Sequence, residues 1–251
     1  MHAAGLSAVG LVREHNEDTI FFSMEPIGPL PNLYIMADGM GGHNAGEVAS
    51  AKSVEFCCNF IRNCPPAASI TPQEALDILV EAAVKANADV FDMATRDPAL
   101  LGMGTTFSAC SIVDGTMTVA HIGDSRIYTM GPGWITQITT DHTYVQEMVQ
   151  AGKLTPAEAR VHPRRNVITR VLGCDPHVSA DTALHKLEDV HHVLLCSDGL
   201  TDMLTDEEIM QLVSQGGPAE YRAQTLIDAA NHQGGIDNIS AIIIDVKGET
   251  H

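Results

Sequence analysis

Short apolar runs bounded by Gly, Pro, Asn or Asp recur along the whole chain and predict β-strands. Two pairs of these runs flank the tight-turn sequences Asp114-Gly115 and Gly131-Pro132-Gly133 and therefore predict β-hairpins. Hairpins of this kind indicate antiparallel pairing. The predicted strands comprise residues 7–12, 19–22, 33–37, 105–113, 116–122, 125–130, 134–138, 192–197 and 239–246.

Helical patterns occupy separate blocks between the groups of strands. One covers about residues 45–63, and a second begins at Thr71-Pro72-Gln73-Glu74, where Thr can cap the helix and Glu follows three residues on. Others are predicted within the polar stretch 141–175, after Thr205, and over about 218–232. Because hairpins adjoin one another and helices come in blocks, the pattern favours an α+β fold with antiparallel sheets over a doubly wound parallel sheet.

Composition narrows the possible functions. The chain has 251 residues, of which 45% are hydrophobic, so it can bury a large core and is not a disordered chain. Its 14 basic and 32 acidic residues give a net charge of −18, which argues against a binder of nucleic acid or of anionic membranes. No repeat, low-complexity tract or Pro/Ser-rich linker divides the chain, so we expect a single domain over residues 1–251.

Cysteine usage and the first residues bear on the compartment. The six cysteines follow no metal-type spacing, and no Cys-x-x-Cys motif occurs. The first residues lack the charged and apolar regions of a signal peptide, and no stretch approaches the ~18 apolar residues of a membrane span. We therefore expect a cytoplasmic protein in a reducing compartment, without disulfides.

Four aspartates stand beside apolar runs. Asp38 and Asp198, each followed by Gly, close two predicted strands, Asp124 follows a third, and Asp237 precedes a fourth. An Asp-Gly pair alone is most often a hairpin turn, as it is at Asp114. Asp38 and Asp198 differ because no second strand follows them directly. A rigid scaffold could therefore hold both carboxylates in a functional site.

Such carboxylates repel one another if the strand ends converge, and they then need a cation. Oxygen ligands suit Mg²⁺ or Mn²⁺, whereas the absence of any His/Cys spacing disfavours zinc. Two such ions about 4 Å apart can lower the pKa of a bridging water and bind the oxygens of a phosphoryl group. If the strand ends converge, the four aspartates could therefore hold two divalent ions.

Six motifs, in order along nearly the whole chain, resemble those of the bacterial metal-dependent protein phosphatases, the type 2C serine/threonine phosphatases. Each motif alone is weak, but six in family order are highly specific. The motifs are VREHNED (residues 12–18), ADGMGGH with AGEVAS (37–43 and 45–50), GMGTT (102–106), GDSR (123–126), CSDGLTD (196–202) and GIDN (235–238).

This resemblance implies roles for the four residues of the main metal pair. Asp38 would bridge two Mn²⁺ or Mg²⁺ ions, and the Gly39 carbonyl would complete the ligands of one of them. Asp198 and Asp237 would hold the other ion. A water or hydroxide between the ions would then attack phosphoserine or phosphothreonine directly, without a covalent intermediate.

The resemblance also assigns five residues around this pair. Arg13 would grip the substrate phosphate, for which a planar guanidinium is well shaped. Glu17 and Asp18 would order metal-bound waters. Asp124, together with Asp198 and Asp202, would hold a third and weaker ion.

One position departs from the family pattern. Animal relatives carry His directly after the Asp-Gly, proposed as general acid for the leaving group, and this chain has Met40 there. His43, three residues on, could replace it, or it could be a solvated loop residue while a metal-bound water supplies the proton.

The family fold is a sandwich of two antiparallel sheets flanked by helix pairs, with a variable flap that corresponds to residues 141–175. Five basic residues lie there, and they could draw in a phosphopeptide or form a solvated face. The implied partners are phosphorylated proteins and a cognate serine/threonine kinase, with the chain a monomer that binds neither nucleic acid nor membrane. The alternative is a phosphatase-like regulatory module with little catalysis.

Overall fold

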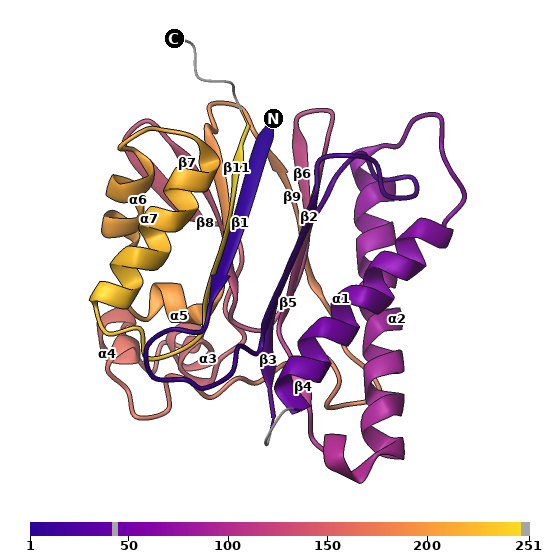
Figure 1. Cartoon of the computed structure of the whole chain (residues 1–251), viewed down its shortest axis with the longest axis horizontal. Coiled ribbons are helices and arrows are strands. Elements are labelled where there is room, and N and C mark those ends of the chain that lie inside the picture. The colour runs from indigo at the N-terminus through magenta and orange to yellow at the C-terminus, as the bar shows by residue number, and fades with distance from the viewer. Residues whose placement is uncertain (42–44, 247–251) are drawn as a thin grey trace.

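Two antiparallel β-sheets form the centre of the fold, which a computed structural model describes for residues 1–41 and 45–246 (Figure 1). One sheet has the strand order β1-β11-β10-β7-β8, and the other has the order β2-β3-β5-β6-β9, with β4 paired to β3. The strands are β1 (His2–Ala8), β2 (Asp18–Ser23), β3 (Leu33–Met40), β4 (Gly104–Thr105), β5 (Phe107–Val113), β6 (Thr116–Ile122), β7 (Arg126–Gly131), β8 (Trp134–Gln137), β9 (Asp181–Lys186), β10 (His192–Cys196) and β11 (Ile239–Asp245).

Helix pairs cover the outer faces of the sheets (Figure 1). The helices α1 (Ala45–Asn63) and α2 (Pro72–Arg96) pack on the β3 sheet, and α6 (Asp206–Val213) and α7 (Ala219–His232) pack on the β11 sheet. The arrangement confirms the predicted α+β sandwich. The shorter helices are η1 (Pro98–Leu100), α3 (Tyr144–Gln150), α4 (Pro156–Arg160) and α5 (Asp198–Thr201).

The helix α2 shows how the sequence determines a boundary. The Thr71 side chain accepts a hydrogen bond from the Glu74 backbone N–H, and the Glu74 side chain accepts one from the Thr71 backbone N–H. This capping box satisfies two N–H groups that the first turn leaves unpaired. Leu79 and Val90 then face the sheet, fully buried.

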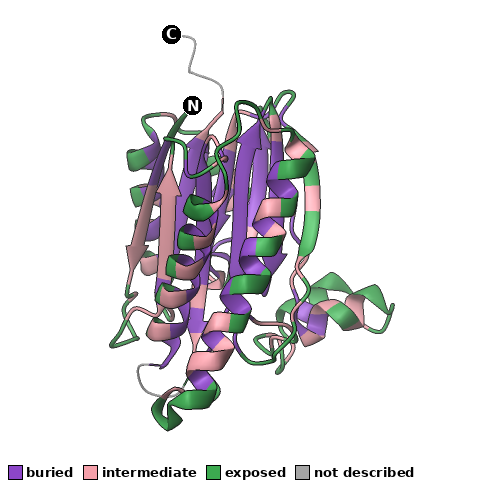
Figure 2. Cartoon of the chain, turned by 90° about the vertical axis from the view of Figure 1, so that its right-hand side faces the viewer, coloured by how far each residue is buried: buried purple, intermediate pink, exposed green. Residues whose placement is uncertain are grey.

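Three apolar clusters make up the core. One lies between the sheets and contains Tyr34, Ile127 and Ile242, and the other two lie beneath the helix pairs. Figure 2 shows many of the strands buried, others only partly buried, and the outward faces of the helices exposed. Within residues 1–41 and 45–246, no helix is both long and apolar enough to cross a bilayer.

Three local predictions need correction. The strand predicted over residues 7–12 instead ends at Ala8, because Gly10 adopts φ +84° and packs against the Asp237 carbonyl. The exposed edge strand β9 was not predicted, since most of its residues are exposed and it contains no apolar run. Asp38 lies inside β3 rather than beyond it, because the strand continues to Met40 by pairing with β4.

Candidate active site

Both sheets bring carboxylates to one end of the sandwich. Asp18 opens β2 and lies directly opposite Asp38 in the β2–β3 register. One residue separates the end of β10 from Asp198, which begins α5, and Asp237 is separated from the start of β11 by Asn238 alone. Asp124 follows the end of β6. The structure thus brings together the aspartates that the sequence analysis singled out.

These side chains are close enough to oppose one another's ionisation. The pKa of Asp38 is raised well above its usual range, first by desolvation and then by the carboxylates of Asp18 and Asp198. The pKa of Asp198 is raised for the same reasons, with Asp124 as its strongest neighbour. Desolvation, reinforced by Asp237, raises the pKa of Asp18 to about 6. Negative charge at this end of the fold is therefore costly without a cation.

Hydrogen bonds hold two of the aspartates in place. The Oδ2 atom of Asp18 accepts hydrogen bonds from Ser197 Oγ at 2.8 Å and from Ser240 Oγ at 2.6 Å. The Asp38 backbone N–H donates to Thr106 Oγ1 at 2.9 Å, and its carbonyl accepts from the Thr106 N–H at 2.8 Å. These bonds fix the positions of Asp18 and Asp38 before any ligand arrives.

Gly39 has no room for a side chain. A Cβ atom there would lie 2.1 Å from the Gly46 carbonyl oxygen at the start of α1. Its N–H donates to the Glu17 carbonyl at 3.1 Å, which joins β3 to the segment that precedes β2. The glycine predicted to be a carbonyl ligand is thus required by the close approach of two backbones.

The donor set fits a hard divalent cation. Buried oxygens of Glu17 (Oε1), Asp18 (Oδ1) and Asp124 (Oδ1) have no hydrogen-bond partner. Every candidate donor is an oxygen, the atom that Mn²⁺ and Mg²⁺ prefer. Among the described residues, no group of three or more His, Cys, Asp or Glu side chains is already arranged to hold a metal ion. The fit therefore rests on donor chemistry, charge and unpaired oxygens, and not on coordination geometry.

Arg13 lies at the edge of this carboxylate cluster. Its guanidinium Nη2 donates to Asp237 Oδ2 at 2.7 Å, and about half of the Arg13 side chain is exposed. Asn238 fixes the loop that carries Arg13, because its Nδ2 donates hydrogen bonds to the carbonyls of Val9 and His15. The Oδ1 of Asn238 accepts from the Glu17 N–H at 2.8 Å. The candidate phosphate ligand is therefore held beside the candidate metal ligands.

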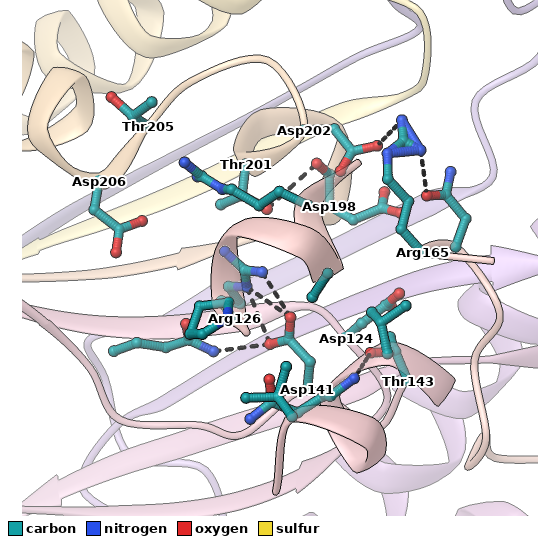
Figure 3. A pocket seen from close by; sticks show the side chains of 18 of the residues that line it. Asp124, Arg126, Asp141, Thr143, Arg165, Asp198, Thr201, Asp202, Thr205 and Asp206 are labelled. Atoms are coloured by element: carbon teal, nitrogen blue, oxygen red, sulfur yellow. Dashed lines mark hydrogen bonds and ion pairs between the residues drawn. The ribbon is translucent and has the colours of Figure 1, made fainter. Parts of the chain in front are cut away.

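A cavity of about 800 Å³ adjoins the cluster on the side of Asp124, Asp198 and Asp202 (Figure 3). Burial, reinforced by Asp141, raises the pKa of Asp124 to about 7. Desolvation also raises the pKa of Asp202, although Arg165 lies 3.2 Å from its Oδ2 and acts in the opposite direction. The candidate third site thus lies where the core meets the segment 141–175.

Several supporting residues escaped the sequence analysis. Ser240 is the second residue of β11, and its sequence context is that of an ordinary strand residue. Asp141 accepts three hydrogen bonds from the Arg126 guanidinium beneath the cavity, and the polar pair Asp141-His142 after a hairpin was its only sequence signal. Arg165 is one of the five basic residues of the segment 141–175, for which the sequence left two roles open. His43 lies outside the described residues.

Comparisons with known proteins agree with this site. A family model described as protein phosphatase 2C matches residues 12–226. The chain is 34% identical over 250 residues to the protein phosphatase PhpP of Streptococcus pneumoniae, with 99% of each chain covered.

Two solved structures are also similar. The serine/threonine phosphatase Stp1 from Staphylococcus aureus superposes with a TM-score of 0.91 at 33% identity, covering 98% of this chain and 95% of that one. The catalytic domain of the serine/threonine protein phosphatase PstP, in complex with two manganese ions, gives a TM-score of 0.82 at 34% identity, with 97% of each chain covered.

The fold and the carboxylate cluster, together with these likenesses, define a metal-dependent protein phosphatase. The chain belongs to the protein phosphatase 2C family, and the members of this family are hydrolases.

Proposed function

We propose that this protein is a serine/threonine protein phosphatase that uses Mn²⁺ or Mg²⁺ to hydrolyse phosphoserine and phosphothreonine in proteins. The observation that carries the proposal is the convergence of buried and partly buried carboxylates at one end of the sandwich, in a chain that matches phosphatases over nearly its full length. Each aspartate expected to hold a metal is present, which favours catalysis over a regulatory module without activity.

The residues of the chain divide into three groups by role. Asp38, the Gly39 carbonyl, Asp198 and Asp237 would hold two ions. When bound, the ions supply a water of lowered pKa and neutralise charge on the phosphoryl oxygens. Asp18 and Glu17 have buried unpaired oxygens that can accept hydrogen bonds from water in the coordination shell. Outer-shell acceptors of this kind orient the ligands of a metal.

Arg13 would bind the substrate phosphate. A guanidinium can donate two parallel hydrogen bonds to phosphate oxygens, and the exposed half of this side chain leaves it accessible to a phosphoprotein. Its present partner, Asp237, places it within reach of the proposed metal ligands. Arg13 would thereby orient the substrate phosphate so that water could approach on the side opposite the leaving Ser or Thr oxygen.

Asp124, Asp198 and Asp202 would hold a third ion more weakly. These side chains line the cavity beside the segment 141–175, which forms the flap of a single phosphatase domain. Few protein ligands are preorganised there, so water must complete the coordination. We place the protein in the cytoplasm as a monomer that opposes a serine/threonine kinase on shared substrates.

A panel of three matched peptides tests the proposal. Peptides of one sequence carrying phosphoserine, phosphothreonine or phosphotyrosine would be incubated with the protein and Mn²⁺, and released phosphate would be measured. We expect rapid hydrolysis of the first two and slow hydrolysis of the third. Mg²⁺ should support activity as well, and Ca²⁺ far less, because Ca²⁺ relaxes the geometry and acidifies water less. Hydrolysis of phosphotyrosine alone, or of none of the peptides, would contradict the proposal.

A further inference from the structure

His142 lies at the junction between the core and the flap, and both of its inward-facing polar groups bind Gly123. Its backbone N–H donates to the Gly123 carbonyl at 2.8 Å. Its imidazole Nδ1 accepts a hydrogen bond from the Gly123 N–H at 3.0 Å. The side chain is buried, so water does not compete for these bonds. His142 thus pairs with both backbone polar groups, the N–H and the carbonyl, of Gly123, the residue directly before Asp124.

The turn at Gly123 has little freedom of its own. Gly123 adopts φ +107°, and a Cβ atom there would lie 2.6 Å from the Thr106 side chain. Thr106 in turn is bonded to the Asp38 backbone. The direction of the Asp124 side chain is therefore set by a turn held between the Asp38 strand and His142.

The outer side of the His142 ring faces Asp181, the first residue of β9. Because Nδ1 accepts a hydrogen bond, the proton of the neutral ring resides on Nε2. Nε2 lies 3.2 Å from Asp181 Oδ2 in a contact that lacks hydrogen-bond geometry, so the attraction is electrostatic. Asp181 also accepts a hydrogen bond from Arg170, on the returning leg of the flap. The His142 carbonyl accepts from the Thr169 N–H at 2.8 Å, which joins the legs at their base.

We propose that His142 is a positioning residue, whose Nδ1 aligns the Gly123-Asp124 turn with the base of the flap and so places the Asp124 carboxylate for the third metal site. The inference rests on the role proposed for Asp124 above. In this arrangement the ring acts through the Gly123 backbone and touches neither substrate nor metal. The acceptor at Nδ1 is the group that matters, and the Asp181 contact serves only to orient the ring.

Four substitutions separate the contributions of the Nδ1 acceptor, the Asp181 contact and the Asp124 carboxylate. His142→Asn places an amide oxygen near the position of Nδ1 and so keeps an acceptor for the Gly123 N–H, but it loses the Asp181 contact. His142→Gln places its polar group near Nε2 instead and loses the acceptor. Asp181→Asn weakens the outer contact while leaving the ring intact. Asp124→Ala removes the proposed metal ligand directly.

Calorimetry with Mn²⁺ would measure binding at the weak site in each variant, and melting without metal would check folding. We expect His142→Gln to weaken the third site about tenfold, as loss of an outer-shell contact does. His142→Asn and Asp181→Asn should stay near the wild-type value. With phosphopeptide, His142→Gln should lower kcat with little change in KM, and His142→Asn should restore it.

The outcomes are distinct. If His142→Gln binds the third Mn²⁺ like the wild type, or if His142→Asn is as impaired as His142→Gln, the positioning role is wrong. If both behave as expected while Asp124→Ala weakens the same site, the inference is supported. If Asp124→Ala leaves Mn²⁺ binding and turnover unchanged, the metal role of Asp124 is wrong, and this inference fails with it while the main pair of ions stands.

Discussion

Replacing Asp124 with Asn should stabilise the metal-free protein while it impairs the third metal site. Asp124 is buried, and Asp141 is the strongest of the carboxylates that oppose its ionisation. Raising its pKa from the ordinary value of 3.8 to about 7 corresponds to an ionisation penalty on the order of 4 kcal/mol in the folded state. Asn keeps the shape of the side chain and removes the charge.

The pH dependence has a definite sign. Because the folded-state pKa is raised above the unfolded one, the wild-type protein takes up a proton on folding between pH 3.8 and about 7. Its stability is therefore lost as the pH rises through this window. The advantage of Asp124→Asn should be about 4 kcal/mol at pH 8, about 2 kcal/mol at pH 5 and negligible below the unfolded-state pKa.

Thermal melting in excess chelator measures this effect. A gain of about 4 kcal/mol corresponds to a rise in Tm of about 10 °C for a chain of this size. Asp114→Asn is the matched control, because Asp114 is an exposed turn residue whose φ of +48° Asn tolerates equally well. We expect no change there. If Asp124→Asn lowers Tm at pH 8, Asp124 is a turn residue whose carboxylate caps the following backbone, and the electrostatic reasoning is refuted.

Three further changes give separable results. Asp38→Asn should lower turnover by orders of magnitude and weaken binding of both proposed main ions in calorimetry, because it removes the charge proposed to bind them, and near-normal turnover would contradict its assignment. Arg13→Ala should raise KM more than it lowers kcat in phosphopeptide assays, as loss of a ground-state phosphate contact does, whereas an unchanged KM would exclude it from substrate binding. Thr71→Ala should cost about 1 kcal/mol in chemical denaturation by removing the α2 cap, with activity per folded molecule unchanged.

Much of the fold was predictable because local signals agreed with the tertiary structure. The capping boxes at Thr71, Thr155 and Thr205 all form where the local sequence is Thr-x-x-Glu, and the Asp114-Gly115 turn joins β5 to β6. The edge strand β9 carried no such signal, because an exposed strand gains its stability from pairing with β6 and not from an apolar run.

The residues of the candidate site likewise fall into those that the sequence could predict and those that it could not. Asp38, Asp198 and Asp237 each adjoin an apolar run and could be singled out from the sequence, as could Gly39 through its motif, although Asp38 lies inside its strand. Ser240 and His142 could not, because their roles depend on partners 222 and 19 residues away that only the folded chain brings close. Supporting contacts of this kind follow from tertiary structure and leave little local pattern.

Metal dependence is the central claim and has a direct test. Protein stripped with a chelator would be given a phosphothreonine peptide, and phosphate release would be followed as Mn²⁺ is added back. We expect no phosphate release before Mn²⁺ is added and a saturable recovery afterwards, in the wild-type protein and not in Asp38→Asn. Full activity in excess chelator would contradict it.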